Sequence, residues 1–139
     1  MKYIVIILTI AVGAVLIINF APIGSSKKTL TADEMRLIRI GDRCAEIADK
    51  SVADKVAIVE FQKLEIASRR YQVISDCMHD NGYKQNPQWL RYATPLARIN
   101  AEKQKISFNE AITTMGNTDM QQFSPNKNQP SYWMGNKIN

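Results

Sequence analysis

Two cysteines and a single histidine are the side chains of this sequence best suited to chemistry. Cys77 and His79 lie two positions apart, with Asp80 beside them, close to the predicted end of a helix. Positions i and i+2 of a helix point about 200° apart, so a thiol–imidazole nucleophile pair does not form there. We interpret His79 as a surface side chain at a helix C-terminus, where the helix dipole stabilises positive charge.

The sequence also lacks the ligand patterns of a metal centre. Zinc sites take four nitrogen, sulfur or oxygen ligands, usually in paired spacings, and this chain has no C-x-x-C and only one histidine. Phosphate-binding glycine motifs, G-x-S-x-G and C-x-x-C-H are absent from the sequence as well. We therefore expect a protein that is not an enzyme and that holds neither a metal nor another cofactor.

Cys44 and Cys77 are instead predicted to pair with each other. An even number of cysteines behind an export-type segment favours one disulfide formed in an oxidising compartment. Two buried free thiols are the alternative, because cysteine is commonly an interior residue.

The export-type segment is the apolar N-terminus, residues 1–24. Residues 3–20 carry no charged side chain and would span roughly 27 Å as a helix, near the ~30 Å hydrocarbon core of a bilayer. That length favours an uncleaved anchor, in contact with lipid through 3–20, over a cleaved signal peptide. Lys27 and Lys28 follow directly and are predicted to contact lipid headgroups.

The length and the charge of the chain exclude further classes of protein. The 139 residues include 18 Lys and Arg against 13 Asp and Glu, a formal net charge of +5. This length permits one small domain and excludes the large α/β barrels. Basic residues form no stripe with interleaved aromatics, so nucleic acid is not an expected partner.

The rest of the chain is predicted to be all-α, because apolar residues recur at helical spacing and no alternating stretch reaches strand length. Thr31 and Glu34 form a capping box that begins a helix running to Asp49. Cys44 lies on the apolar face of this helix, and nearby Gly41 is expected to let another helix approach closely.

A second apolar stripe precedes Gly82, which can supply the left-handed residue that ends a helix. Its members share one face of a long helix: Val52, Val56, Val59, Phe61, Leu64, Ala67, Tyr71, Ile74, Cys77 and Met78. A turn at 50–51 would leave Cys77 more than seven helical turns away and too far from Cys44 for a disulfide. The chain therefore either reverses near 57–62 or forms a separate short helix over 52–59, and we favour the short helix.

Capping signals continue after Gly82. The dipeptides Asn86-Pro87 and Thr94-Pro95 predict two short helices, over 87–92 and 95–105. A capping box at Ser107 predicts a third helix that ends at Gly116.

These elements divide the chain into four predicted parts. The anchor or signal at 1–24 and a linker at 25–30 precede a small helical domain at 31–116. The tail at 117–139 is rich in Asn, Gln, Ser and Pro, and we expect little regular structure there.

The tail contains the predicted partner-binding residues. Aromatic side chains dominate the energetics of protein interfaces, and the tail clusters Phe123, Tyr132, Trp133 and Met134. The alternative is that these side chains dock on their own domain, as ordered chain ends must be held down.

The combined expectation is a non-catalytic envelope protein that acts by protein–protein binding, as an accessory subunit of a membrane assembly. We expect a single pass through a bacterial inner membrane, with the C-terminal domain on the periplasmic side. Cleavage of the N-terminal segment would instead give a periplasmic or secreted protein. A second hypothesis is an exported small-ligand carrier with a pocket lined by Tyr71, Tyr83, Trp89 and Tyr92.

Overall fold

The computed structural model describes residues 29–136, and 67% of these residues are helical. The predicted anchor, its lipid contacts at 3–20, Lys27 and Lys28 lie outside this range. The elements in chain order are α2 (Ala32–Val52), α3 (Glu60–Asp80), β1 (Tyr83–Gln85), α4 (Pro87–Gln104), α5 (Phe108–Asp119) and β2 (Trp133–Gly135). Within 29–136, no helix has both the length and the apolar character needed to cross a membrane.

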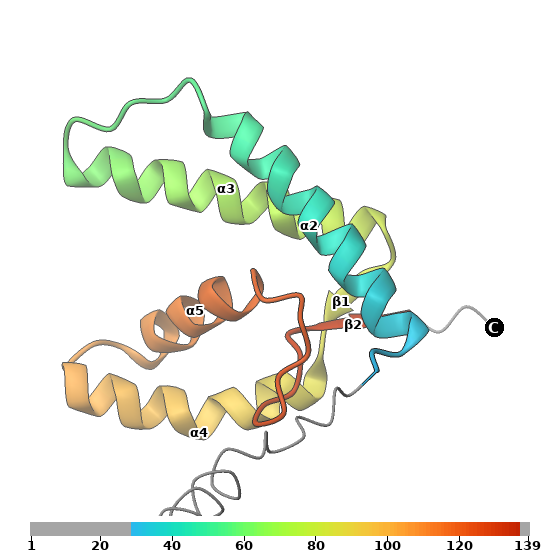
Figure 1. Cartoon of the computed structure of the whole chain (residues 1–139). Coiled ribbons are helices and arrows are strands. Elements are labelled where there is room, and N and C mark those ends of the chain that lie inside the picture. The colour runs from blue at the N-terminus through green and yellow to red at the C-terminus, as the bar shows by residue number, and fades with distance from the viewer. Residues whose placement is uncertain (1–28, 137–139) are drawn as a thin grey trace, which may run out of the picture.

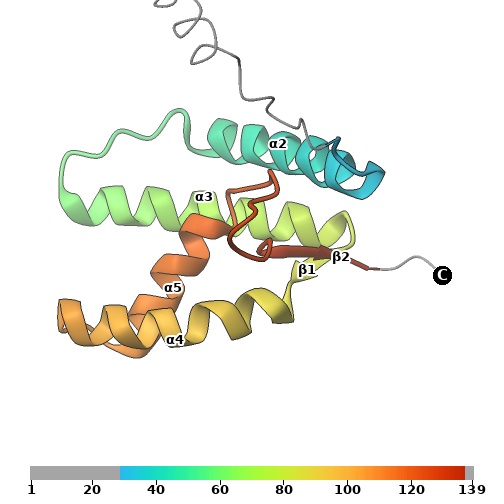
Figure 2. The ribbon, with the colours of Figure 1, turned by 60° about the horizontal axis from the view of Figure 1, so that its bottom comes forward.

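The helices form two hairpins. α2 packs along α3, and α4 packs along α5 (Figure 1). β1 and β2 pair antiparallel between the hairpins, at the end of the molecule that we call the base. Both hairpin turns lie at the opposite end (Figures 1 and 2). The hairpins are therefore joined at one end of the fold.

The start of α2 confirms the predicted capping box. The Glu34 amide donates to Thr31 Oγ1 at 3.2 Å, and the Thr31 amide donates to Glu34 Oε2 at 2.7 Å. These bonds satisfy two of the amides that a helix N-terminus leaves without intrahelical partners. Cys44 faces the core and is fully buried, also as predicted.

The Cys44–Cys77 disulfide is confirmed, with 5.6 Å between the two Cα atoms. The predicted short helix over 52–59 is wrong, because α2 runs on to Val52 and residues 53–59 form the reversal. Gln62 accounts for the start of α3, since its Oε1 accepts from the amides of Ile58 at 2.7 Å and Val59 at 3.2 Å. The chain thus reverses close to the other predicted position, 57–62.

The end of α3 also follows the prediction. Gly82 takes the left-handed conformation, with φ of +80°, and turns the chain into β1. The ribbon itself was not expected, because three-residue strands are too short to show alternation. It is extended by the Asn136 amide, which donates to the Gly82 carbonyl at 2.8 Å.

The predicted break at Pro95 is wrong, because α4 is one helix with Pro95 inside it. Thr94 does not act as a cap; its hydroxyl donates to the Leu90 carbonyl, one turn earlier, at 2.7 Å. The proline is exposed, so its ring faces solvent. Packing against α5 through the small buried residues Ala97 and Ala101 keeps the helix continuous.

The predicted end of the next helix at Gly116 is also wrong. α5 begins at the expected Ser107 cap and continues to Asp119. A Cβ at Gly116 would lie 3.6 Å from both the Trp89 and the Tyr132 rings, so this glycine lies beneath two aromatic rings.

The main core is built from both sides of the disulfide and from the segment after α5. Its buried members are Cys44, Ala48, Ile74, Met78, Tyr83, Met120, Phe123 and Trp133. A second, smaller cluster holds α4 to α5 through Ala97, Ala101 and Ala111. The close approach expected at Gly41 comes from the Phe123 ring, in the segment after α5, and not from another helix. The ring occupies the space that a Cβ at position 41 would fill.

Removing the disulfide should destabilise the domain strongly. Replacing both cysteines by alanine should lower the free energy of unfolding by about 4 kcal/mol, because the bond closes a loop across 33 positions. Denaturant unfolding of the full chain in mild detergent measures this change, and reduced wild-type protein should show a similar loss. An unfolding free energy that does not change on reduction would contradict the expectation.

Gly41→Ala should destabilise the fold even though alanine favours helices. The gain in helix propensity is about 1 kcal/mol, whereas displacing the Phe123 ring costs up to about 3 kcal/mol. We expect a net loss of about 1–2 kcal/mol, partly rescued by Phe123→Leu in a double-mutant cycle. Gly116→Ala is the matched control, since its Cβ would make only ordinary contacts and the variant should be at least as stable as wild type.

Candidate functional site

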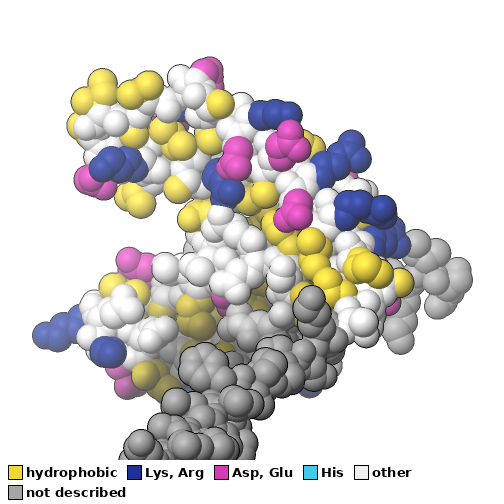
Figure 3. Space-filling model, viewed as in Figure 1, with side chains coloured by type: hydrophobic (Ala, Val, Ile, Leu, Met, Phe, Trp, Pro, Cys, Tyr) yellow, Lys and Arg dark blue, Asp and Glu magenta, His cyan; other side chains and the backbone are white. Residues whose placement is uncertain are grey.

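The turn between α2 and α3 presents apolar side chains that the core does not cover. The exposed fractions are 84% for Ile58, 81% for Val56, 74% for Phe61, 69% for Leu64 and 54% for Val59. We call these five residues the apolar tip; the corresponding surface is apolar in Figure 3, at upper left. Single exposed apolar residues are normal, whereas five of them within nine positions of the chain make this turn a candidate interaction surface.

An open groove of about 770 Å³ runs beside the apolar tip. Phe61, Leu64, Ser68 and Gln72 of α3 line it at helical spacing, together with residues 54–56 of the turn. The groove therefore extends from the apolar tip along α3.

Charged groups surround the tip without favouring either sign. Glu60 and Lys63 form an exposed ion pair at 2.6 Å. Three acids and three bases lie around the tip: Asp54, Glu60, Glu65, Lys55, Lys63 and Arg69. An apolar centre with a balanced polar rim is the usual anatomy of a protein–protein interface.

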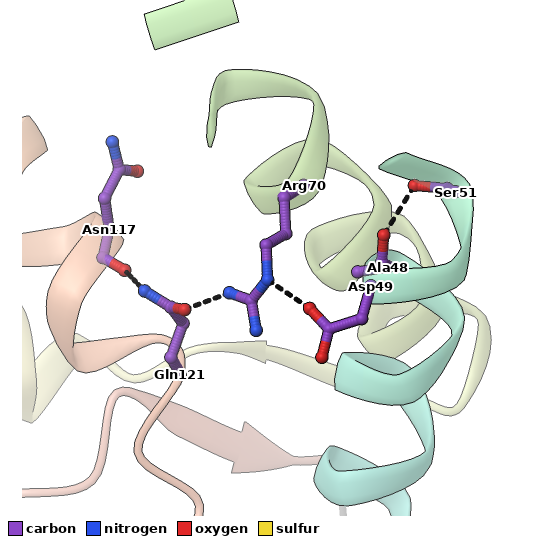
Figure 4. Close-up of polar contacts among 6 residues, drawn as sticks. All are labelled: Ala48, Asp49, Ser51, Arg70, Asn117 and Gln121. Atoms are coloured by element: carbon purple, nitrogen blue, oxygen red, sulfur yellow. Dashed lines mark hydrogen bonds and ion pairs between the residues drawn. The ribbon is translucent and has the colours of Figure 1, made fainter. Parts of the chain in front are cut away.

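Arg70, midway along α3, connects the first hairpin to the second by hydrogen bonds (Figure 4). Its Nε donates to Asp49 Oδ1 of α2 at 2.5 Å, and its guanidinium also donates to the side chain of Gln121. Gln121 in turn donates from Nε2 to the carbonyl of Asn117, in α5, at 2.8 Å. This chain of bonds connects α2 through α3 to the end of α5. The two helices that carry the apolar tip are therefore linked to the second hairpin.

The predicted partner-binding residues of the tail lie mainly inside the domain. Phe123 and Trp133 are only 6% and 3% exposed, and Trp133 Nε1 donates to the Met120 carbonyl at 2.7 Å. Neither side chain can therefore offer a surface to a partner while the tail stays docked. Met134 is 36% exposed, and binding through the tail stays a prediction that rests on Met134 and Tyr132.

Tyr132 packs edge-to-face between two tryptophans, with ring centroids 4.7 Å from Trp89 and 4.9 Å from Trp133. Burial raises the pKa of its hydroxyl above the usual 10.0, against a smaller opposing effect from the Gln85 amide that donates to it. The ring therefore serves as a packing element between the two tryptophans.

The four aromatics of the ligand-carrier hypothesis do not line the groove beside the tip. Tyr83 and Trp89 are buried, and Trp89 Nε1 donates to Asp119 Oδ2 at 2.8 Å. Tyr71 packs against the main core, while Tyr92 is half-buried on α4.

The two cysteines and the histidine, the side chains best suited to chemistry, all make structural contacts. Both thiols are in the disulfide, and exposed His79 in the last turn of α3 lies edge-on to Trp133, with 5.9 Å between ring centroids. Within the described range, no three His, Cys, Asp or Glu side chains gather in a way that could hold a metal ion.

Comparison with known proteins adds no functional assignment. No protein-family model, no curated protein and no solved structure matches this chain.

The sequence placed most of the apolar tip on a buried helix face, which the structure shows to be wrong. Val56 and Val59 lie in the reversal, while Phe61 and Leu64 lie on the first turns of α3 beyond the end of α2. The position of Cys77 far from the start of its helix was the available signal, since it implies a stretch of α3 without α2 beside it.

The neighbouring residues Trp133 and Met134 provide a direct test of the tail's role. Trp133→Ala should cost about 3–5 kcal/mol, because it empties a buried site and removes a hydrogen bond to the Met120 carbonyl. Met134→Ala should stay within about 0.5 kcal/mol, as an exposed substitution. Denaturant unfolding of both variants measures the difference, and equal effects would show that the tail is not part of the core.

Proposed function

We propose that this chain is a non-catalytic, membrane-anchored binding protein of an oxidising compartment, whose apolar tip contacts another subunit of a membrane assembly. The observation that carries the proposal is the exposure of the five large apolar side chains of the tip, on the α2–α3 turn and the start of α3. Covering a side chain of this kind releases about 1.5–3 kcal/mol, so their burial by a partner would drive association.

The disulfide supports the oxidising compartment of this proposal. A disulfide that closes the main hairpin persists where thiols are oxidised, such as the bacterial periplasm. The uncharged run at 3–20 supports an inner-membrane anchor, and the disulfide supports a position of the domain on its periplasmic side.

A protein partner suits the tip better than a lipid surface does. Anionic bilayers attract basic segments, whereas the charges around the tip balance, and one acid and one base are already paired as Glu60–Lys63. The tip thus offers apolar area without a net positive charge. We assign the main partner contact to the apolar tip, and within the tail only Met134 and Tyr132 remain as predicted contacts.

Ile58→Ser with Phe61→Ser should abolish partner binding without unfolding the domain, because both side chains are mostly exposed. We expect the yield of a stoichiometric co-purifying membrane protein to fall at least roughly tenfold, as for interface hot spots. Purification of the full chain from membranes in mild detergent, with quantitative mass spectrometry, measures the yield.

The matched control is Ile99→Ser with Phe108→Ser, which removes the same two residue types from the second hairpin, where they are also exposed. Melting temperatures of both double variants establish that the domain remains folded. Equal loss in the two variants, or no stoichiometric partner of the wild-type chain, would refute the proposed contact.

A further inference from the structure

α2 turns a row of arginines toward solvent on the side opposite the core. Arg36, Arg39 and Arg43 recur at three- and four-residue spacing, which places them on one stripe of the helix, and all three are exposed. The outer side of α2 carries dark blue basic side chains in Figure 3, with magenta acidic side chains between them. The buried residues of α2 project the other way and are Gly41, Cys44 and Ala48. We call the three arginines the arginine stripe.

The arginine stripe has no acidic partner among the described residues. The carboxylates further along α2 are engaged elsewhere, since Glu46 pairs with Lys50 at 2.6 Å and Asp49 pairs with Arg70 at 2.5 Å. The hydrogen bond from Lys50 also lowers the pKa of Glu46. Three guanidinium groups on about 10 Å of helix are thus available to an external anion.

The covalent chain limits how far the arginine stripe can be from the proposed anchor. Residues 21–31 connect the end of the apolar run to α2, and such a connection extends at most about 40 Å. This connection carries Lys27 and Lys28. The first two dozen positions after the run therefore hold five basic residues against three acidic ones, Asp33, Glu34 and Asp42, which leaves a net charge of +2, whereas the charges around the apolar tip balance. An anionic membrane surface attracts Lys and Arg side chains that lie within a Debye length of it.

We propose that α2 lies along the membrane surface with the arginine stripe on anionic lipid headgroups, an inference that rests on the proposed anchoring. Guanidinium groups suit this contact because they donate two parallel hydrogen bonds to a phosphate. α2 is about 31 Å long, with the apolar tip just beyond its far end. With α2 flat on the bilayer, the tip points sideways along the membrane, where another membrane subunit can meet it.

The test uses the full chain in lipid nanodiscs made either of phosphatidylcholine alone or of phosphatidylcholine with phosphatidylglycerol. A gadolinium chelate on a lipid headgroup broadens the NMR signals of nearby backbone amides. We expect the amides of residues 36–43 to be broadened several-fold more in the anionic discs than in the neutral ones. Added salt should reduce the difference, because it screens exposed charges.

The triple variant Arg36→Gln, Arg39→Gln and Arg43→Gln should lose this extra broadening. Its matched control replaces three exposed bases of the second hairpin, Arg91, Lys103 and Lys105, by glutamine and should retain it. Equal broadening in the two lipids, or equal behaviour of the two variants, with the chain retained in the discs, would overturn the headgroup contact alone. Loss of the wild-type chain from both kinds of disc would overturn the anchor and this contact together.

Discussion

The disulfide between Cys44 and Cys77 sets the register on which the rest of the structure depends. Cys44 lies eight residues before the end of α2, and Cys77 lies seventeen residues after the start of α3. About 12 Å of α2 therefore faces about 26 Å of α3 on the turn side of the bond. The first turns of α3 have no helix beside them, and residues 53–59 must stretch along the difference. The exposure of Phe61 and Leu64 is a direct consequence of this mismatch.

The disulfide fixes one helix pair, but it does not supply a core large enough for a domain of this size. The segment after α5 completes that core by sending Phe123 under α2, where Gly41 leaves room for its ring, and Trp133 beside α3. Packing of this kind concentrates at the base, where the ribbon also joins the hairpins. Arg70, midway along α3, adds a hydrogen bond to Gln121 beyond α5. The two turns at the far side are left without mutual support, so their side chains remain available for contacts.

Features that depend on a few neighbouring residues could be predicted from the sequence. The capping box at Thr31, the cap at Ser107 and the left-handed Gly82 each rest on hydrogen bonds or torsions within about four positions. The continuity of α4 through Pro95 and the course of α5 past Gly116 depend on rings and small side chains from distant segments. The candidate site was missed for the same reason, because an apolar stripe is read as buried unless the length of the opposing helix is known.

The disulfide also relates the compartment of the protein to the surface it offers. In the reduced chain nothing covalent holds Cys44 opposite Cys77, and α2 and α3 could slide to pair more of their apolar residues. The overhang that exposes the apolar tip is therefore most secure where the thiols are oxidised. A binding surface produced by helix register, rather than by a loop insertion, depends on the contacts that hold α2 to α3. These contacts are the disulfide, the Arg70–Asp49 ion pair and the main core, and all of them lie on the base side of the apolar tip.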